Sequence, residues 1–341
     1  MYWQLMLDNS FLDRHTEYNK IRVLLHFSIL SQNYSCFDMP LLALPNELLL
    51  AVARWLDLER DINALARTNR RLYLLLNSHL YRYNVQHSNS SALLWAAEYK
   101  QTKTAQKLVW EHACIQTRNS HDETPLFIAA RNGDEEMIEL LLQCGADLES
   151  KNNFGITALS YATRHGAPVK FLLEKGADPL ARDNYGRTPL IYAGCWGTEA
   201  AMKFILHHRA DIESKDIDGW TALAYAARWG RETTVQLLLR HGADPESRDN
   251  DGRVALLHAA RWGMDIVVGL LLTHGCDIES KDDEGWTALT HAARWGKEAV
   301  VKLLLHHGAD PESRDNGGAT PFSHASAHGN REIASLLLEM N

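Results

Sequence analysis

Histidines at fixed intervals are the residues of this chain most able to do acid–base or metal chemistry. His258, His291 and His324 follow one another at steps of 33 residues. Apolar or aromatic residues fill the equivalent position in other segments: Trp95, Ile128, Tyr161, Tyr192 and Tyr225. A position that accepts Trp, Ile, Tyr and His is expected to be a packing site, so these histidines predict no metal centre.

Two histidine pairs, His207–His208 and His306–His307, stand at the ends of predicted helices, where the helix dipole favours such side chains. The sequence contains no zinc-binding spacing, P-loop, nucleophile elbow or dinucleotide-binding glycine motif. We therefore expect no catalytic residue, no metal and no cofactor, and the chain is not predicted to be an enzyme.

The composition argues against several classes of partner. The net charge of −8 does not favour nucleic acid, which needs a basic face. No apolar run reaches the roughly 18 residues that a membrane span requires. The five cysteines form no C-x-x-C pair, which fits free, mostly buried thiols in a reducing compartment. The expected location is the cytoplasm, the nucleus or both.

Tryptophan and arginine form the pattern with the clearest binding potential. Trp196, Trp229, Trp262 and Trp295 each precede a glycine of the repeat described below, and three of them follow Arg228, Arg261 and Arg294. Both residue types are enriched in binding hot spots, so a ladder of this kind could hold an extended or helical peptide. The alternative is that each Trp stacks on a neighbouring Arg and only fills a groove wall.

A repeat of about 33 residues organises all of these positions. The threonine of a T-x-L motif, or T-x-F in the last case, recurs six times, with steps of 33 or 31 residues and Val254 in the one gap: Thr124, Thr157, Thr188, Thr221, Thr287 and Thr320. Each unit predicts two short helices, because apolar residues recur at helical spacing and glycines follow each helix. One unit cannot cover its own apolar face, so the units are expected to stack.

These units resemble the ankyrin repeat, as in GWTALAYAARWGRETTVQLLLRHGADPESRD. The resemblance covers residues 88–341: a degenerate capping repeat at 88–121, then six units and a truncated seventh over 122–341. It implies an all-α fold, a solenoid of helix-turn-helix units with β-hairpin tips. It also implies that the four tryptophans and three arginines border the concave surface, where a target protein binds, with Trp220 and Trp286 near the hairpin tips.

Two units depart from the repeat pattern. The second unit lacks two residues between Gly166 and Gly176, so its second helix is expected to be shortened. In the third unit Arg209 replaces the glycine that follows the second helix. If Arg209 keeps the left-handed conformation of that glycine, it carries strain of roughly 1–2 kcal/mol. The charged ESKD and ESRD segments between units are expected to be mostly solvated.

Residues 39–84 precede the repeats and predict three short helices with a core too small to stand alone. The start of this segment, Leu44-Pro45-x-Glu47-Leu48, resembles the F-box. That resemblance implies contact with a Skp-type adaptor, and through it a cullin, by five residues: Leu44, Pro45, Leu48, Leu56 and Leu65. The alternative is that these helices only cap the repeat stack.

The order of an F-box followed by ankyrin repeats is similar to that of many proteins of filamentous fungi. Residues 1–38 resemble neither part and are expected to be a non-native or disordered extension. Together these features predict the substrate receptor of a cullin-based (SCF-type) ubiquitin ligase, whose target protein the sequence does not name. The alternative function is an ankyrin scaffold for protein–protein interaction without a ligase role.

Overall fold

The computed structural model describes residues 49, 85, 91–164, 168–196 and 198–339. The chain divides into two compact units, and the described residues 93–106 and 115–339 belong to the second of them. The predicted extension 1–38 and, apart from Leu49, the predicted F-box 39–84 lie outside the described residues, as do all five adaptor-contact residues of that prediction.

Helices alternate regularly along the described chain, with a first and a second helix in each repeat. The first helices are α5 (Ser91–Glu98), α7 (Pro125–Asn132), α9 (Ala158–Ala162), α11 (Pro189–Trp196), α13 (Ala222–Arg228), α15 (Ala255–Trp262), α17 (Ala288–Arg294) and α19 (Pro321–Ala327). The second helices are α6 (Thr102–Trp110), α8 (Glu135–Gln143), α10 (Val169–Glu174), α12 (Glu199–His207), α14 (Glu232–Arg240), α16 (Asp265–Thr273), α18 (Glu298–His306) and α20 (Arg331–Glu339).

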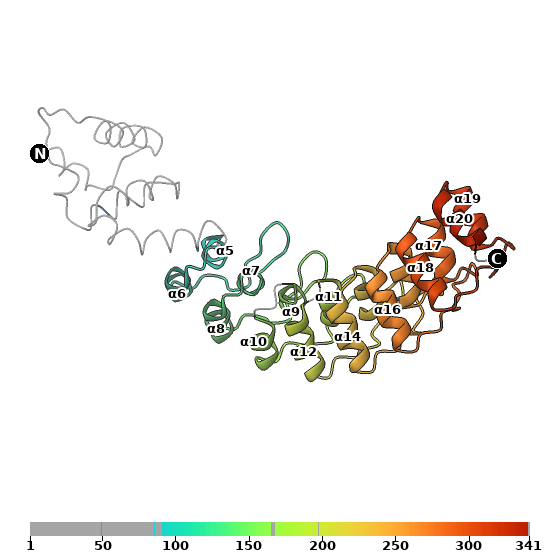
Figure 1. Ribbon diagram of the computed structural model, residues 1–341. Helices are drawn as coiled ribbons and strands as arrows, with labels where there is room; N and C mark the ends of the chain where they lie inside the picture. Colours follow the sequence, from blue (N-terminus) through green and yellow to red (C-terminus); the bar gives the residue numbers. More distant parts are fainter. Residues whose placement is uncertain (1–48, 50–84, 86–90, 165–167, 197, 340–341) are drawn as a thin grey trace, which may run out of the picture. The chain divides into compact units, whose positions relative to one another are not determined.

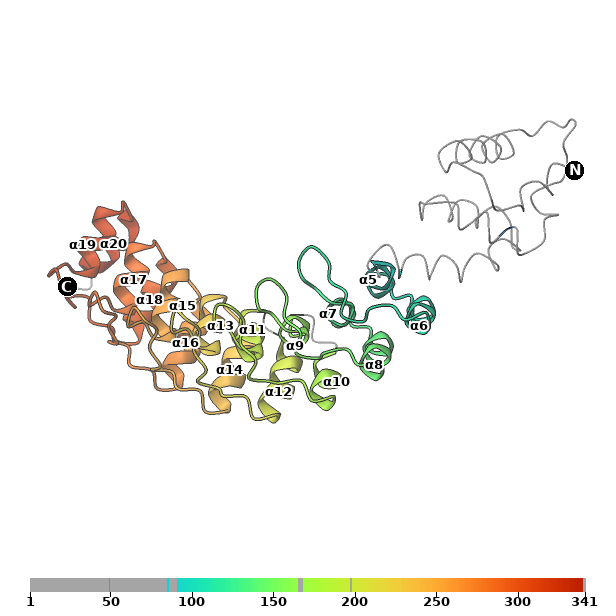
Figure 2. The ribbon, with the colours of Figure 1, turned by 180° about the vertical axis from the view of Figure 1, so that it is seen from behind.

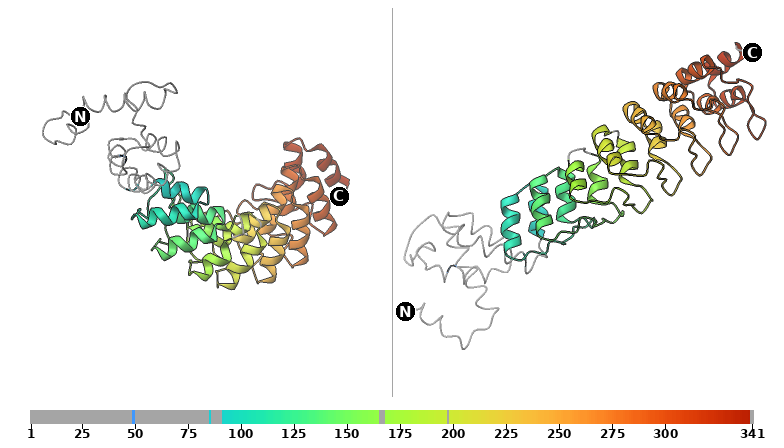
Figure 3. Two further views of the ribbon diagram at one scale, coloured as in Figure 1. Left: turned by 90° about the vertical axis from the view of Figure 1, so that its left-hand side faces the viewer. Right: turned by 90° about the horizontal axis from the view of Figure 1, so that it is seen from below.

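From α7 onward, each first helix packs on its own second helix and on the first helix of the next repeat. Figures 1 and 2 show the resulting row from two sides, with the first helices along its inner edge and the second helices along its outer edge. Loops project from one edge of the row (Figure 3). The core between the helices consists of small and branched apolar residues such as Ala226, Ala227 and Leu238, all fully buried.

Small residues in the first helices allow this close stacking. A Cβ added to Gly194 would lie 2.6 Å from the carbonyl oxygen of Ala222 in the next first helix. The threonine of each T-x-L motif begins a first helix, because its hydroxyl accepts the backbone N–H three residues later. Phe127 donates to Thr124 in this way at 3.2 Å, whereas Val254 has no such hydroxyl. This N-cap satisfies a backbone donor that the helix leaves unpaired.

The predicted β-hairpin tips are not found, because the described part of the chain contains helices and turns but no strand. The side chain of an asparagine, in the first two repeats, or of an aspartate, in the later ones, organises each tip instead. In the third repeat, one oxygen of Asp183 accepts the backbone N–H groups of Tyr185 and Arg187, both at 2.8 Å. These donors are therefore bound within the turn rather than in a strand ladder.

Both departures from the repeat pattern have the expected structural result. Helix α10 has 6 residues, whereas its neighbours α8 and α12 have 9 each. Arg209 has φ 63°, close to the left-handed values of the glycines at the equivalent positions, such as Gly242 at 88°. The two missing residues thus shorten a helix without interrupting the alternation of first and second helices.

Candidate functional site: a tryptophan–arginine column

Eight residues at the ends of the first helices form one line that we call the Trp–Arg column. Its members are Trp196, Trp229, Trp262 and Trp295 with Arg164, Arg228, Arg261 and Arg294. The tryptophans are 41%, 52%, 43% and 47% exposed, in chain order. Large aromatic side chains with this much exposure, one in each of four successive repeats, leave an extended aromatic surface uncovered.

Three of the four cations of the column reach forward to the next repeat, whereas Arg294 lies 4.7 Å from the ring centre of Trp286 in its own repeat. The guanidinium of Arg164 lies 4.2 Å from the ring centre of Trp196. Arg228 lies 4.6 Å from Trp262, and Arg261 lies 5.0 Å from Trp295. The expected stacking of Trp on a neighbouring Arg is therefore present. It does not cover the rings, since about half of each remains open to solvent.

Arg164 was not singled out from the sequence, although it occupies the same repeat position as Arg228 and Arg261. Cys195 takes that position in the third repeat. Trp229 therefore receives no cation from the repeat before it and instead faces Arg228 of its own repeat, at 5.3 Å. The column therefore has a tryptophan in each of four successive repeats, whereas its series of arginines is interrupted at Cys195.

The later arginines of the column have no ion pair with a carboxylate among the described residues. The buried Nε of Arg228 has no hydrogen-bond partner in this part of the chain. By contrast, Arg131, at the same repeat position, pairs with both Glu98 and Glu123. Burial lowers the pKa of Arg261 from its ordinary value, and the nearby charges of Arg253, Arg228 and Arg294 lower it further. The later arginines of the column are thus not neutralised by direct ion pairs.

Trp220 and Trp286 lie at the bases of the tips and are half-buried. The ring of Trp220 packs against Tyr225 at 5.0 Å and against His258 of the next repeat at 4.0 Å. Trp286 contacts His291 and His324 in the same manner, at 5.2 and 4.9 Å. These two tryptophans join adjacent repeats through these contacts.

The repeating Tyr and His position of the first helices is a hydrogen-bonding site as well as a packing site. From the third repeat to the seventh, an aspartate nine residues earlier, at the tip, forms a hydrogen bond with it. The hydroxyls of Tyr192 and Tyr225 donate to Asp183 and Asp216 at 2.7 and 2.8 Å. The Nε2 atoms of His258, His291 and His324 lie 2.9, 2.9 and 2.7 Å from Asp249, Asp282 and Asp315. The fixed spacing of nine residues was the sequence signal for this pairing.

Burial governs the protonation of two of these histidines. It lowers the pKa of His258 and His291 and outweighs the opposite effect of their aspartate partners. Nδ1 of both rings is buried and has no partner among the described residues. A neutral ring that donates from Nε2 satisfies the aspartate without placing a second, unpaired donor in the core. These histidines are therefore structural groups rather than acid–base catalysts.

A pocket of about 290 Å³ lies beside the column between the fifth and sixth repeats. Its walls combine three arginines, two tryptophans, one histidine and four acids: Arg253, Arg261, Arg294, Trp286, Trp295, His291, Asp251, Asp282, Asp283 and Glu284. Two of the acids are already engaged, because Asp251 pairs with Arg253 and Asp282 accepts from His291. Asp283 and Glu284 are exposed. The pocket thus has a cationic and aromatic wall and an acidic rim.

A family model described as ankyrin repeats (3 copies) matches residues 63–152, 126–216, 213–282 and 256–341. The chain belongs to the ankyrin-repeat family. It is also similar to human transient receptor potential cation channel subfamily A member 1, with 37% identity over 97 residues. That match covers 26% of this chain and 9% of the human protein. The chain therefore corresponds to a small part of that relative.

The loops between ankyrin repeats connect the repeats by hydrogen bonds, although their basic side chains are exposed. A Lys or Arg at the same position of each repeat donates to the backbone carbonyl of that position in the next. The side chain of Lys215 donates to the carbonyl oxygen of Arg248 at 2.8 Å, and that of Arg248 donates to the carbonyl oxygen of Lys281 at 2.6 Å. The side chain of Lys281 donates in turn to the carbonyl oxygen of Arg314 at 2.9 Å. Glutamates form a parallel series, in which Glu246 accepts the backbone N–H of Asp277 at 3.0 Å.

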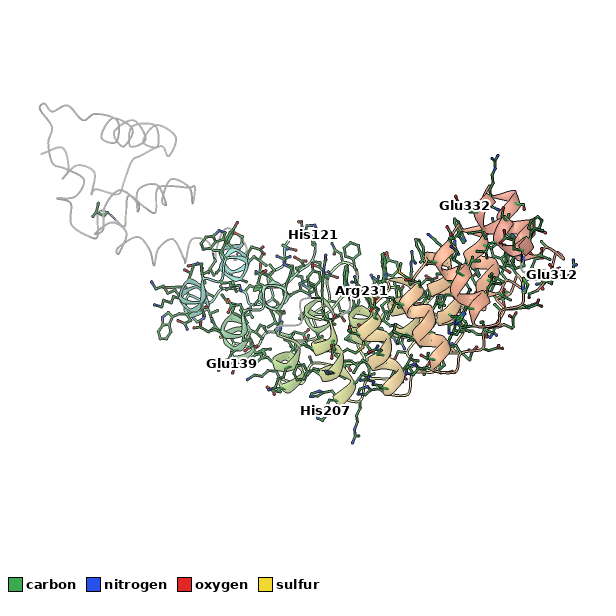
Figure 4. All side chains as sticks on the ribbon, viewed as in Figure 1. His121, Glu139, His207, Arg231, Glu312 and Glu332 are labelled. Atoms are coloured by element: carbon green, nitrogen blue, oxygen red, sulfur yellow. The ribbon has the colours of Figure 1, made fainter. Side chains whose placement is uncertain are left out.

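The predicted histidine pairs lie at the ends of second helices of the ankyrin repeats. Nδ1 of His208 and of His307 lies 2.8 and 2.9 Å from a backbone carbonyl four residues earlier. Figure 4 shows His207 and Glu139 on the outer, second-helix edge of the row and Arg231 on the other edge.

No group of three or more potential metal ligands occurs among the described residues. None of the helices in this part of the chain is long and apolar enough to cross a membrane.

Cys144, Cys195 and Cys276 are free thiols. Cys276 is buried, and burial raises its pKa to about 12. Cys195 is half-buried and its pKa is also raised to about 12, again by burial. Cys114 is exposed, unlike the mostly buried thiols expected from the sequence. Thiols with such raised pKa values are poor nucleophiles, so Cys195 and Cys276 suit packing rather than catalysis.

Proposed function

We propose that the ankyrin stack binds a target protein through the Trp–Arg column and that the chain is the substrate receptor of a cullin-based ubiquitin ligase. The exposed tryptophans, flanked by arginines without ion-pair partners, carry the target-binding half of this proposal. Trp and Arg dominate binding hot spots because they combine a large contact area with directional polar groups. An ankyrin stack with a merely structural tryptophan series would be expected to bury those rings.

The ligase half of the proposal is supported by the F-box-like segment ahead of the repeats. Leu44, Pro45 and Leu48 would contact a Skp-type adaptor, together with Leu56 and Leu65. The chain then acts by proximity, because holding a lysine of the target near the transfer centre raises its effective concentration. In this mechanism another subunit performs the chemistry, and this chain supplies binding alone.

Capture of the target tests the first half. We expect the double variant Trp262→Ala, Trp295→Ala to lose proteins that co-purify with the full chain. Trp110→Ala is the matched control, since Trp110 is 84% exposed and lies outside the column. Thermal unfolding of each variant reports on folding. Unchanged capture by the double variant, with a large loss of stability, would show that the column only holds the repeats together.

Capture of the adaptor tests the second half. The full chain is expected to pull down a purified fungal Skp-type adaptor, and the double variant Leu44→Ala, Pro45→Ala is expected not to. Circular dichroism should show that the ankyrin stack of this variant is still folded. No capture by either chain would contradict the ligase role.

A scaffold without a ligase role is the second candidate, and one observation favours it. The match to the ankyrin family begins at residue 63, within the segment predicted to be the F-box. This overlap fits helices that cap the stack. The adaptor experiment separates the two candidates, because a scaffold would keep its target and fail to bind the adaptor.

A further inference from the structure

The arginines of the Trp–Arg column are arranged to receive negative charge from outside the chain. Arg228, Arg261 and Arg294 come from three successive repeats and have no ion pair with a carboxylate among the described residues. Each guanidinium lies over the ring of a tryptophan, at 4.6, 5.0 and 4.7 Å from the ring centre, and is partly exposed to solvent. A planar guanidinium donates two parallel hydrogen bonds to a carboxylate.

From this arrangement we propose that the column binds an extended acidic segment of the target protein, with one Asp or Glu side chain on each arginine. This inference rests on the proposed target binding and names the chemistry of what is bound. The pocket between the fifth and sixth repeats is the strongest site, because Arg261 and Arg294 both line it beside Trp286 and Trp295.

The repeat geometry sets the spacing of the acidic residues. Stacked helices lie about 8–10 Å apart. An extended peptide advances about 3.3 Å per residue. Consecutive arginines of the column therefore match acidic residues three positions apart, while the residues between them lie over the exposed tryptophans. A segment with acids at three successive such positions, and apolar residues among them, fits the column.

The rim of the pocket favours a carboxylate over a phosphate. Asp283 and Glu284 are exposed and line the same pocket as the two arginines. A phosphate group carries about 1.5 to 2 negative charges at neutral pH, so these acids repel it more strongly than a carboxylate. The net charge of −8 also disfavours the continuous phosphate backbone of nucleic acid.

Peptide selection on the full-length chain tests the inference directly. The probe is a displayed library of random peptides about twelve residues long, which is enough to span three repeats. We expect the selected peptides to be enriched in Asp and Glu at three-residue spacing. Synthetic copies of the selected peptides, measured by fluorescence anisotropy, should bind more weakly at high salt. Peptides of the same composition with the acidic residues placed side by side should also bind more weakly.

Arginine variants connect the selected peptides to the column. Arg261→Gln and Arg294→Gln are each expected to weaken binding about tenfold, in the range of hot-spot residues. Arg261→Lys should restore part of the loss, because it keeps the charge without the planar fork. Arg240→Gln removes the same charge from an exposed position in α14, away from the column, and should bind as the wild type does.

Each remaining outcome overturns a defined part of the inference. Selected peptides without an acidic preference, or with affinity unchanged by Arg261→Gln, would exclude an acidic segment while target binding by the tryptophans still stood. Tighter binding when phosphoserine replaces a Glu would show that the pocket prefers phosphate. If the binding of every selected peptide were also unaffected by Trp262→Ala, Trp295→Ala, the proposed function of the column would fail as well.

Discussion

At the scale of single residues, the tip aspartates and their first-helix partners give the stack a dependence on pH. The pKa of His258 and of His291 is lowered from the ordinary value of 6.5. The unfolded chain therefore takes up a proton on each ring near pH 6.5, while the folded chain keeps both rings neutral to lower pH. Stability is expected to be constant above about pH 6.5 and to fall as the pH decreases below it.

The double variant His258→Tyr, His291→Tyr should reduce this fall. Tyrosine already fills the same position in three repeats, and in two of them it donates to the equivalent aspartate, at 2.7 and 2.8 Å. Each histidine can account for at most about 2 kcal/mol between pH 6.5 and 5, since one pH unit is worth about 1.4 kcal/mol per proton. Thermal unfolding at pH 7, 6 and 5 measures the difference. Equal losses in the variant and the wild type would show that other groups control the acid sensitivity.

At the scale of the helices, Arg209 marks the end of α12 in a conformation that the other repeats give to glycine. Its φ is 63°, and a Cβ meets no atom within 4 Å at the equivalent Gly145, Gly176, Gly242, Gly275 and Gly308. The cost of Arg209 is therefore backbone strain rather than a clash. Arg209→Gly should relieve about 1–2 kcal/mol of strain, offset in part by the roughly 0.5–1 kcal/mol by which glycine favours the unfolded chain.

The expected net result for Arg209→Gly is a small gain in the free energy of unfolding, measured by urea denaturation. Gly242→Arg provides the reverse experiment in the next repeat and should destabilise by about 1 kcal/mol or more, for the same reason. A loss of stability in Arg209→Gly would show that the Arg209 side chain makes a contribution larger than the strain it imposes.

The alternation of helices was predictable from the sequence because it depends on local patterns. The T-x-L motif begins each first helix, and the missing residues before Gly176 predicted the short α10. The side-chain contacts between repeats were less accessible. A step of 33 residues shows which residues share a column, but it does not show that Arg228 leans forward onto Trp262. The hairpin tips were predicted from the resemblance to the ankyrin repeat, whereas the side chain of Asp183 binds the backbone N–H groups of its tip in a turn.

Side-chain contacts between repeats, which the sequence does not show, also limit the prediction of the site. The four tryptophans and three arginines were identified from residue type and spacing, and they do form one column. Arg164 was missed because it does not precede a tryptophan in its own repeat, although it contacts Trp196 in the next. Trp220 and Trp286 were grouped with the target-binding residues, whereas their contacts with His258 and His324 join neighbouring repeats.

At the scale of the whole molecule, the series of Lys and Arg side chains couples each ankyrin repeat to the next. The bonds from Lys215, Arg248 and Lys281 all end on a backbone carbonyl of the following repeat. Repeat stacks unfold cooperatively only while the contacts between neighbours are strong compared with the stability of single repeats. Removal of these side chains should therefore change the cooperativity of unfolding as well as its midpoint.

The triple variant Lys215→Ala, Arg248→Ala, Lys281→Ala tests this coupling. Each lost hydrogen bond should cost about 0.5–1 kcal/mol, because all three donors are at or near the surface. We expect the urea transition to move to lower concentration and to broaden as the repeats begin to unfold separately. Lys203→Ala, Lys302→Ala is the control, since both lysines pair only within their own helices, with Glu199 and Glu298. A shifted transition of unchanged slope would mean that the apolar core alone couples the repeats and that the charged series adds only local stability.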